Sequence, residues 1–380
     1  MNKVKTAIIY HYIAHYRKHI FETLSKESIN SNIQYEIFAD DKANIDSIKV
    51  LNHETDSEKI NWYKIRCRWI TKDIMWQWGA IKVALSKKYQ CIILLGNMYF
   101  VSTWIAAIIA RLTGKRVLMW THGTRKKESG IKGIVRRSFY RLAHGLLLYG
   151  EWGKSILLES KLNPETLYVV NNSLDYDNQK SIRDNITQKE KDELRRRLHI
   201  PNNSHIIISI CRLTKTKQLS LLVNAIANTE DIYALIVGDG PDKENLQKLS
   251  SSLGIEKKVI FYGSSYCEED NAKLFSISDL CVIPGDIGLT AMHAMAYGVP
   301  VITHNNFEVQ GPEFEAIQPD ITGDFFQFGN LVDLVRVINK WISTPKSDEK
   351  AINCISRIEE KYTVIFQRKI FHYAVLGNKA

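Results

Sequence analysis

The sequence has too few suitably placed cysteines for a metal centre or a disulfide framework. Its six cysteines are scattered along 380 residues, and none forms a C-x-x-C pair. This spacing argues against zinc and iron–sulfur sites and against a disulfide-stabilised fold, and free thiols suit a reducing cytosol. We therefore expect a cytoplasmic protein. The cysteines are Cys67, Cys91, Cys211, Cys267, Cys281 and Cys354.

Long hydrophobic runs are also scarce. The opening apolar stretch is too short for a signal peptide. Tyr89–Ala110 carries no formal charge, so a transmembrane helix is one interpretation of it. Gly96 and Asn97 split the stretch, however, and we favour a buried strand (Cys91–Leu95), a loop and a helix (Phe100–Leu112).

Acidic residues are under-represented in the first half of the chain. Residues 1–175 hold 27 Lys and Arg against 15 Asp and Glu, whereas the remainder holds 24 against 26. Basic residues alternate with tryptophan in Trp62–Trp69, and a second basic cluster spans Arg125–Arg141. Cationic side chains beside aromatic rings favour an anionic membrane surface or a phosphorylated lipid, with a merely solvated face as the alternative.

Nucleic-acid and dinucleotide signatures are missing as well. No helix-turn-helix, zinc-finger or RNP pattern is present, so we expect no nucleic-acid partner. No G-x-G-x-x-G follows the first predicted strand, which argues against a dinucleotide dehydrogenase.

What is present is an alternation of strands and helices in two series. Such alternation predicts parallel sheets covered on both faces. We expect an α/β protein of two Rossmann-like doubly wound domains facing across a cleft, at residues 1–180 and 185–356. The polar stretch Asp175–Ser204 marks the link, and it contains Thr187 and Glu190, spaced as a capping box that opens a helix running to Ile200. Arg357–Val375 has a helical pattern.

The stretch Pro284–Asn306 predicts a strand end, a glycine turn, a short helix and another strand. Thr290 is the predicted helix cap, and Gly298 and Pro300 end the helix. The backbone N–H groups of Gly288–Thr290 would form an anion site at the helix start. Any α/β protein has such units, so the pattern alone leaves a structural role open.

Two loops upstream add possible phosphate ligands. Arg212 and Lys217 follow a predicted strand, where a guanidinium takes phosphate bidentately and an ammonium adds a point charge. Together they could neutralise a leaving diphosphate without a metal; solvated loop cations are the alternative. Gly238 and Gly240 form a G-x-G turn after the next strand, and Tyr262 ends the strand after that.

These motifs together resemble the retaining GT-B glycosyltransferases of family four. The segment from Gly288 to Ile302 is similar to the family's E-G-F-G-L-x-x-x-E-A-M-A-x-G-x-P-V-I. Residues 205–325 also resemble its G-R-L-x-x-x-K-G loop, with Gln218 in place of the final glycine, and its G-D-G-P, V-x-F-x-G, P-E and T-G marks in order. The two glutamates are absent. Gly285 stands in place of the first, with Asp286 beside it, and His293 stands in place of the second.

The resemblance implies a GT-B fold, in which residues 357–380 cross back to the first domain, and it implies a set of site residues. It implies front-face transfer, in which the departing phosphate oxygen takes the acceptor proton. In the family the first glutamate grips the donor sugar and the second grips ribose, so Asp286 and His293 would have to serve here. No metal or other cofactor is expected. The implied residues are catalytic His122, Arg212, Lys217 and Asp286; donor-binding Gly238, Gly240, Tyr262, Gly288, Leu289, Thr290 and His293; and acceptor-side His15, Arg17 and Arg125.

The resemblance thus predicts a glycosyltransferase, peripheral at the inner face of the plasma membrane. Its partners would be a nucleotide-sugar donor, a glycan or lipid-linked glycan acceptor and the anionic membrane surface. Three alternatives stay open: a nucleotide-sugar 2-epimerase of the same fold, a non-catalytic sugar-nucleotide-binding or scaffold protein, and an inactive subunit that has lost its glutamates.

Overall fold

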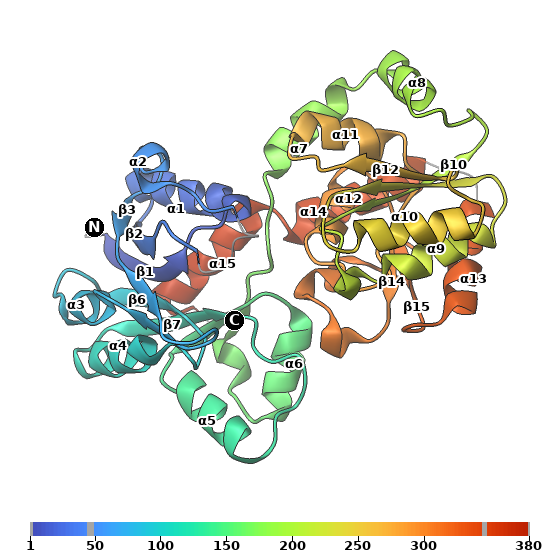
Figure 1. Ribbon diagram of the computed structural model, residues 1–380. Helices are drawn as coiled ribbons and strands as arrows, with labels where there is room; N and C mark the ends of the chain where they lie inside the picture. Colours follow the sequence, from blue (N-terminus) through green and yellow to red (C-terminus); the bar gives the residue numbers. More distant parts are fainter. Residues whose placement is uncertain (1–2, 44–48, 344–347, 379–380) are drawn as a thin grey trace. The chain divides into compact units, whose positions relative to one another are not determined.

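The computed structural model describes residues 3–43, 49–343 and 348–378. The chain forms two compact units, each built on a parallel sheet with helices packed around it (Figure 1). The first unit contains the residues up to Leu174 together with those from Thr363 onward, and the second contains Asp175–Tyr362.

The first unit is built on a parallel sheet with the order β3-β2-β1-β6-β7-β8-β9, and β4 pairs antiparallel with β5 beside it. Alternate residues of β1 enter separate hydrophobic clusters, Ile8 in one and Ala7 and Ile9 in the other, as expected when both faces of a sheet are covered. The strands are β1 (Val4–Tyr12), β2 (Ile33–Asp40), β3 (Trp62–Lys64), β4 (Cys67–Trp69), β5 (Met75–Gln77), β6 (Cys91–Leu95), β7 (Arg116–Thr121), β8 (Gly145–Leu148) and β9 (Leu167–Val169).

The helices of this unit include the last one in the chain. They are η1 (His15–Arg17), α1 (Lys18–Asn30), α2 (His53–Asp56), α3 (Ala80–Leu85), α4 (Val101–Leu112), α5 (Gly130–Tyr140), α6 (Glu151–Glu159), η2 (Pro164–Thr166) and α15 (Val364–Leu376). The predicted strand and helix within Tyr89–Ala110 are confirmed as β6 and α4. Among the described residues, none of the helices combines the length and apolarity needed to cross a bilayer.

The second unit is built on a parallel sheet with the order β12-β11-β10-β13-β14-β15. Its strands are β10 (His205–Ile210), β11 (Ile232–Val237), β12 (Val259–Gly263), β13 (Leu280–Val282), β14 (Val301–His304) and β15 (Gly323–Phe326). Its helices are α7 (Tyr176–Asn185), α8 (Gln188–Arg197), η3 (Lys215–Lys217), α9 (Leu219–Ala227), α10 (Lys243–Ser252), α11 (Glu268–Ser276), α12 (Thr290–Ala296), η4 (Phe307–Val309), η5 (Pro312–Ala316), α13 (Leu331–Ser343) and α14 (Asp348–Lys361).

The first unit ends at Leu174 and the second begins at Asp175, where the predicted polar link also begins. Helix α7 belongs wholly to the second unit, because Tyr176 donates to Glu359 (2.6 Å) and Gln179 donates to Glu268 (3.1 Å). The predicted capping box opens α8: Thr187 accepts from the Glu190 backbone, and the Glu190 carboxylate accepts from the Thr187 backbone.

The single C-terminal helix predicted over Arg357–Val375 is wrong. The structure has two helices, and Thr363 starts the second by accepting a hydrogen bond from the backbone N–H of Phe366. The break at Thr363 is also where the chain returns to the first unit. There the ring of Phe371 is fully buried 4.9 Å from that of Trp120.

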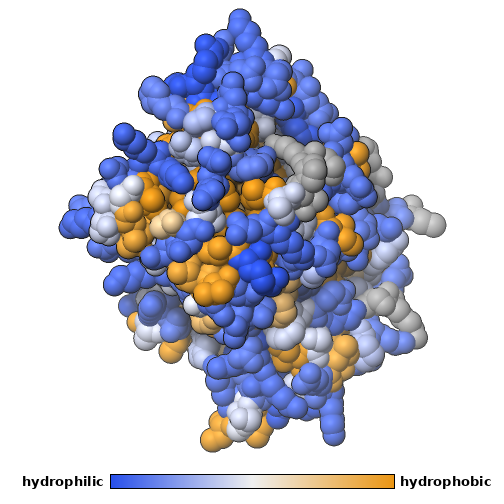
Figure 2. Space-filling model, turned by 90° about the vertical axis from the view of Figure 1, so that its right-hand side faces the viewer, coloured by the Kyte–Doolittle hydropathy of each residue, from blue (hydrophilic) through white to orange (hydrophobic). Residues whose placement is uncertain are grey.

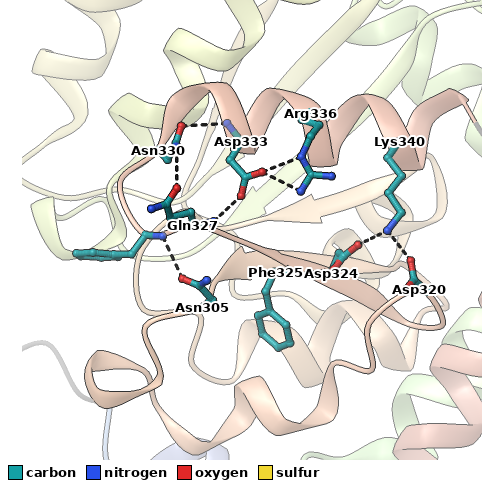
Figure 3. A network of polar contacts seen from close by, with 10 residues as sticks. Asn305, Asp320, Asp324, Phe325, Gln327, Asn330, Asp333, Arg336 and Lys340 are labelled. Atoms are coloured by element: carbon teal, nitrogen blue, oxygen red, sulfur yellow. Dashed lines mark hydrogen bonds and ion pairs between the residues drawn. The ribbon is translucent and has the colours of Figure 1, made fainter.

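Strand β15 and its connection to α13 were not predicted. Figure 3 shows how polar contacts hold this corner: Asn330 accepts from the backbone of Asp333, whose carboxylate accepts from the backbone of Gln327 (2.7 Å). Lys340 on α13 forms ion pairs with Asp320 and Asp324. The face drawn in Figure 2 is mainly hydrophilic with smaller apolar patches, as expected for a protein whose apolar residues lie in its cores.

Candidate active site

The predicted donor-binding residues gather at one edge of the second sheet. Because β10, β11 and β13 are parallel neighbours, the loops that follow them meet at their shared carboxyl edge. Backbone hydrogen bonds tie these loops together: Leu213 donates to Asp239 (2.9 Å), and Gly285 donates to Lys217 (2.9 Å). The structure therefore brings the loops carrying Arg212, Gly238 and Asp286 side by side.

Glycine is required at Gly238 and Gly240. Both have positive φ, and a Cβ there would lie 1.9 Å from the carbonyl oxygen of Cys211 and 2.3 Å from that of Leu213, respectively. The G-D-G-P turn thus packs directly on the backbone of the loop that carries Arg212.

The same crowding explains Gly285. A Cβ at this position would lie 2.0 Å from the carbonyl oxygen of Thr216. A glutamate in place of Gly285 does not fit against this loop without a backbone shift. The Thr216–Lys217 segment thus packs where a side chain on residue 285 would extend.

Lys217 is the cation that reaches the glycine turn. Its Nζ donates to the carbonyl oxygen of Asp286 (2.5 Å) and lies 3.9 Å from the position of a Cβ on Gly288. Arg212 is exposed on the loop that follows β10. A phosphate bound at the glycine turn would therefore lie beside the Lys217 ammonium.

The predicted role of Thr290 as the helix cap is wrong. Leu289 occupies the cap position of α12 without a side-chain hydrogen bond, and Thr290 is the first helical residue. The Thr290 hydroxyl donates instead to the carbonyl oxygen of Ile210 (2.8 Å) and so ties α12 to the end of β10. This contact with the end of a strand 80 residues earlier cannot be inferred from the local spacing of residues.

Asp286 and the segment after β14 form a second part of the site. Asp286 Oδ1 accepts from the backbone N–H of Gly311 (2.8 Å). A Cβ on Gly311 would lie 2.6 Å from Glu313 Oε2 and 3.4 Å from Asp286 Oδ1, so the two carboxylates face the same glycine. Glu313 belongs to the P-E mark of the sequence but was not among the predicted site residues.

Gln310 is a further residue that the sequence did not reveal. Its buried amide donates to Thr303 (2.8 Å) and accepts from the backbone N–H of Ile287 (2.9 Å). It therefore fixes the turn that presents Asp286 and Gly288. No local motif marks a glutamine for this role.

His293 does not stand alone on α12. Its Nε2 and the Glu268 Oε1 atom are 2.8 Å apart, and Tyr297 (2.7 Å) and Gln179 (3.1 Å) donate to that same oxygen. Burial raises the pKa of the Glu268 carboxyl, but these hydrogen bonds and the charge of His293 outweigh burial and lower that pKa to about 2. Glu268 is thus a carboxylate at any physiological pH.

The predicted residues of the first unit also lie around the carboxyl edge of their sheet. The exposed His122 follows β7, and its ring lies 4.4 Å from that of Tyr149, which follows β8. Arg17 is buried, with its guanidinium 4.6 Å from the Tyr149 ring. Its acceptor-side role remains a prediction.

His15 and Arg125 are both exposed. The carbonyl of Arg125 accepts from the indole N–H of Trp152 (2.9 Å). Among the described residues, no cluster of three or more His, Cys, Asp or Glu side chains is arranged to hold a metal ion.

A comparison with protein families shows which family the second unit resembles. Residues 190–357 match the family model of glycosyl transferases group 1. The matched segment contains the loops after β10, β11, β12, β13 and β14. The match confirms the predicted resemblance at the level of the family, for the second unit.

Curated relatives are similar to this chain over part of their length. The lipopolysaccharide 1,6-galactosyltransferase of Salmonella typhimurium is 33% identical over 132 residues, which is 33% of this chain and 36% of the relative. The N-acetyl-alpha-D-glucosaminyl L-malate synthase of Bacillus anthracis is 30% identical over 203 residues, or 50% of each chain. The chain therefore matches between a third and a half of the length of these relatives.

Solved structures extend the likeness to both units. A glycosyltransferase from Rickettsia africae has a TM-score of 0.77 at 18% identity, covering 99% of each chain. Anabaena HepE in complex with UDP has a TM-score of 0.73 at 17% identity, covering 97% of this chain and 98% of that one. These neighbours confirm the predicted two-domain α/β fold of the GT-B class.

Proposed function

We propose that the chain is a metal-independent, retaining glycosyltransferase of surface-polysaccharide biosynthesis. It moves a sugar from a nucleotide-diphosphate donor to a glycan acceptor carried on a lipid diphosphate. The observation that carries this proposal is the position of the Lys217 ammonium, 2.5 Å from the Asp286 carbonyl at the turn leading to α12. The relative named for lipopolysaccharide galactosyl transfer and the neighbour crystallised with UDP support the pathway and the donor class.

In the proposed reaction the bond between the anomeric carbon and the phosphate oxygen breaks on the face where the acceptor oxygen attacks. The acceptor proton passes to the departing phosphate, so no separate protein base is needed. The chain's task is to position both substrates and to stabilise the charge that develops on the leaving group. Lys217 and Arg212 supply cations for that charge, while Asp286 holds a hydroxyl of the donor sugar.

Replacing Lys217 tests this assignment. Lys217→Ala should lower the turnover number by about 100- to 1,000-fold, the range seen when one preorganised donor to a developing anion is removed. Folding should change little, because the side chain is only half-buried and its hydrogen bond is to a loop carbonyl. The measurement is transfer from radiolabelled nucleotide sugars, with thermal unfolding followed in parallel.

Lys215→Ala is the matched control. Lys215 lies in the same short helix and is exposed. It should keep wild-type turnover. If Lys217→Ala also transfers normally, Lys217 is not part of the leaving-group site.

The alternatives give other results in the same assay. A non-catalytic binding or scaffold protein of this fold would bind a nucleotide diphosphate but release no transferred or hydrolysed product. An epimerase would convert the donor without an acceptor. A screen of nucleotide diphosphates by thermal shift comes first, since a ligand at a hundred times its Kd stabilises the folded state by about 2.7 kcal/mol.

A further inference from the structure

Glu268 has an arrangement that a purely structural tie does not require. Three donors converge on its Oε1 atom, from His293, Tyr297 and Gln179. Among the described residues, none makes a hydrogen bond to the other carboxylate oxygen. The side chain is 29% exposed, so this second oxygen is accessible from solvent.

The position of Glu268 is at the ligand edge of the sheet. It is the first residue of α11, and the loop that precedes it starts at Gly263, the last residue of β12. In a parallel sheet the helix after a strand begins at the strand's carboxyl end. Glu268 thus lies at the same edge as the G-D-G-P turn and the start of α12.

The chemistry of the held carboxylate suits a diol. A carboxylate accepts hydrogen bonds only, and it has lone pairs to spare for two hydroxyl donors. With its pKa lowered to about 2, Glu268 is ionised, and hydrogen bonds to an ionised acceptor are stronger than neutral ones. The 2′- and 3′-hydroxyls of a ribose are donors of this kind.

We propose that Glu268 is the residue that recognises the ribose hydroxyls of the nucleotide donor, and that His293 is a positioning residue that holds it. This inference rests on the proposed function, because it needs a nucleotide diphosphate in the second unit. It explains why a histidine can stand on α12: the carboxylate comes from α11, and the imidazole orients it.

The test measures how strongly the protein prefers ribonucleotides over 2′-deoxyribonucleotides. UDP, GDP and ADP are titrated into the full-length wild type by calorimetry, each against its 2′-deoxy counterpart. We expect the bound ribonucleotide to be preferred by about tenfold or more, as for a hydrogen bond to a charged group. In Glu268→Gln the preference should shrink several-fold, and in Glu268→Ala it should approach parity.

Glu269→Gln is the matched control, since Glu269 is the next residue and its carboxylate accepts from the thiol of Cys267 (3.0 Å), not from α12. It should keep the wild-type preference. Because Glu268 ties three helices, its variants are checked for folding by circular dichroism. If they do not fold, His293→Leu, which removes one donor to the carboxylate, should still reduce the preference, whereas His293→Gln should retain it.

The outcomes separate the two proposals. If none of the three ribonucleotides binds the wild type, the proposed function fails and this inference fails with it. If one binds and the folded Glu268 variants keep the wild-type preference, Glu268 is only a tie between helices and the inference is overturned. If the Glu268 variants do not fold, an unchanged preference in His293→Leu also overturns it.

Discussion

Individual glycines decide whether the site forms. At Gly238 the backbone has a φ of +142°, and a Cβ would lie 1.9 Å from the Cys211 carbonyl oxygen. Gly238→Ala should therefore destabilise the second unit by more than the roughly 1–2 kcal/mol that left-handed strain alone costs a residue with a side chain. The loop carrying Arg212 must move to relieve the contact, so nucleotide binding should weaken as well.

Gly254→Ala is the control that separates the cost of a positive φ from the cost of the close contact with Cys211. Gly254 also has positive φ (+67°), but nothing lies within 4 Å of its Cβ position. Urea unfolding and nucleotide titration of both variants provide the measurement. Equal destabilisation by the two substitutions would show that the close approach at Gly238 carries no cost.

Residues of this kind were readable from the sequence to different degrees. The G-D-G-P turn was predicted because two glycines directly after a strand indicate a backbone conformation that other residues do not readily adopt. The partner of His293 was not predicted, because Glu268 lies on another helix and no local period connects the two. Gln310 was missed for the same reason: its four partners come together only when β13 and β14 pair.

At the scale of whole elements, hydrophobic patterns predicted the long central strands best. Strand β6 has the predicted limits, and α4 begins one residue later than the predicted helix. The antiparallel pair β4–β5 was missed because its strands have three residues each, too few for a period to show. The break between α14 and α15 was missed because a single cap at Thr363, not a glycine or proline, makes it.

Helix α5 is the element on which the expected membrane contact depends. Its apolar residues Ile131 and Ile134 are 82% and 56% exposed, and the exposed Lys126, Lys127 and Arg141 flank it. Reversing these three charges to Glu should weaken binding to vesicles of phosphatidylglycerol and phosphatidylcholine by at least about 100-fold, at roughly 1 kcal/mol per basic residue near an anionic surface. Vesicle sedimentation measures this.

A control variant with the same change in net charge keeps the α5 result specific. Lys189, Lys248 and Lys257 are exposed on the second unit, and their reversal to Glu should leave sedimentation unchanged. Transfer to a soluble acceptor should survive in both variants. Equal loss of vesicle binding in the two variants would show that net charge alone determines binding. If neither variant loses binding, the basic residues around α5 are simply solvated.

At the scale of the whole molecule, the first unit is formed by two separate segments, because the chain returns to it at Thr363. Helix α15 contributes Phe371, Ala374 and Val375 to the core that also contains Ile8 and Trp120. Arg116 of β7 fixes the end of this helix by donating to the carbonyl of Ala374 (2.7 Å). The first unit therefore includes a helix that follows the whole second unit in the sequence.

This topology predicts that Phe371 stabilises the first unit although it is distant in sequence. Phe371→Ala should cost that unit about 3–5 kcal/mol, as for other fully buried phenylalanines. Seven of the eight tryptophans lie in the first unit and only Trp341 lies in the second, so tryptophan fluorescence reports mainly on the first. Phe275→Ala, an equally buried change in α11, should leave that fluorescence transition in place while it lowers the stability of the second unit. A common shift of the transition in both variants would mean that the two units unfold as one.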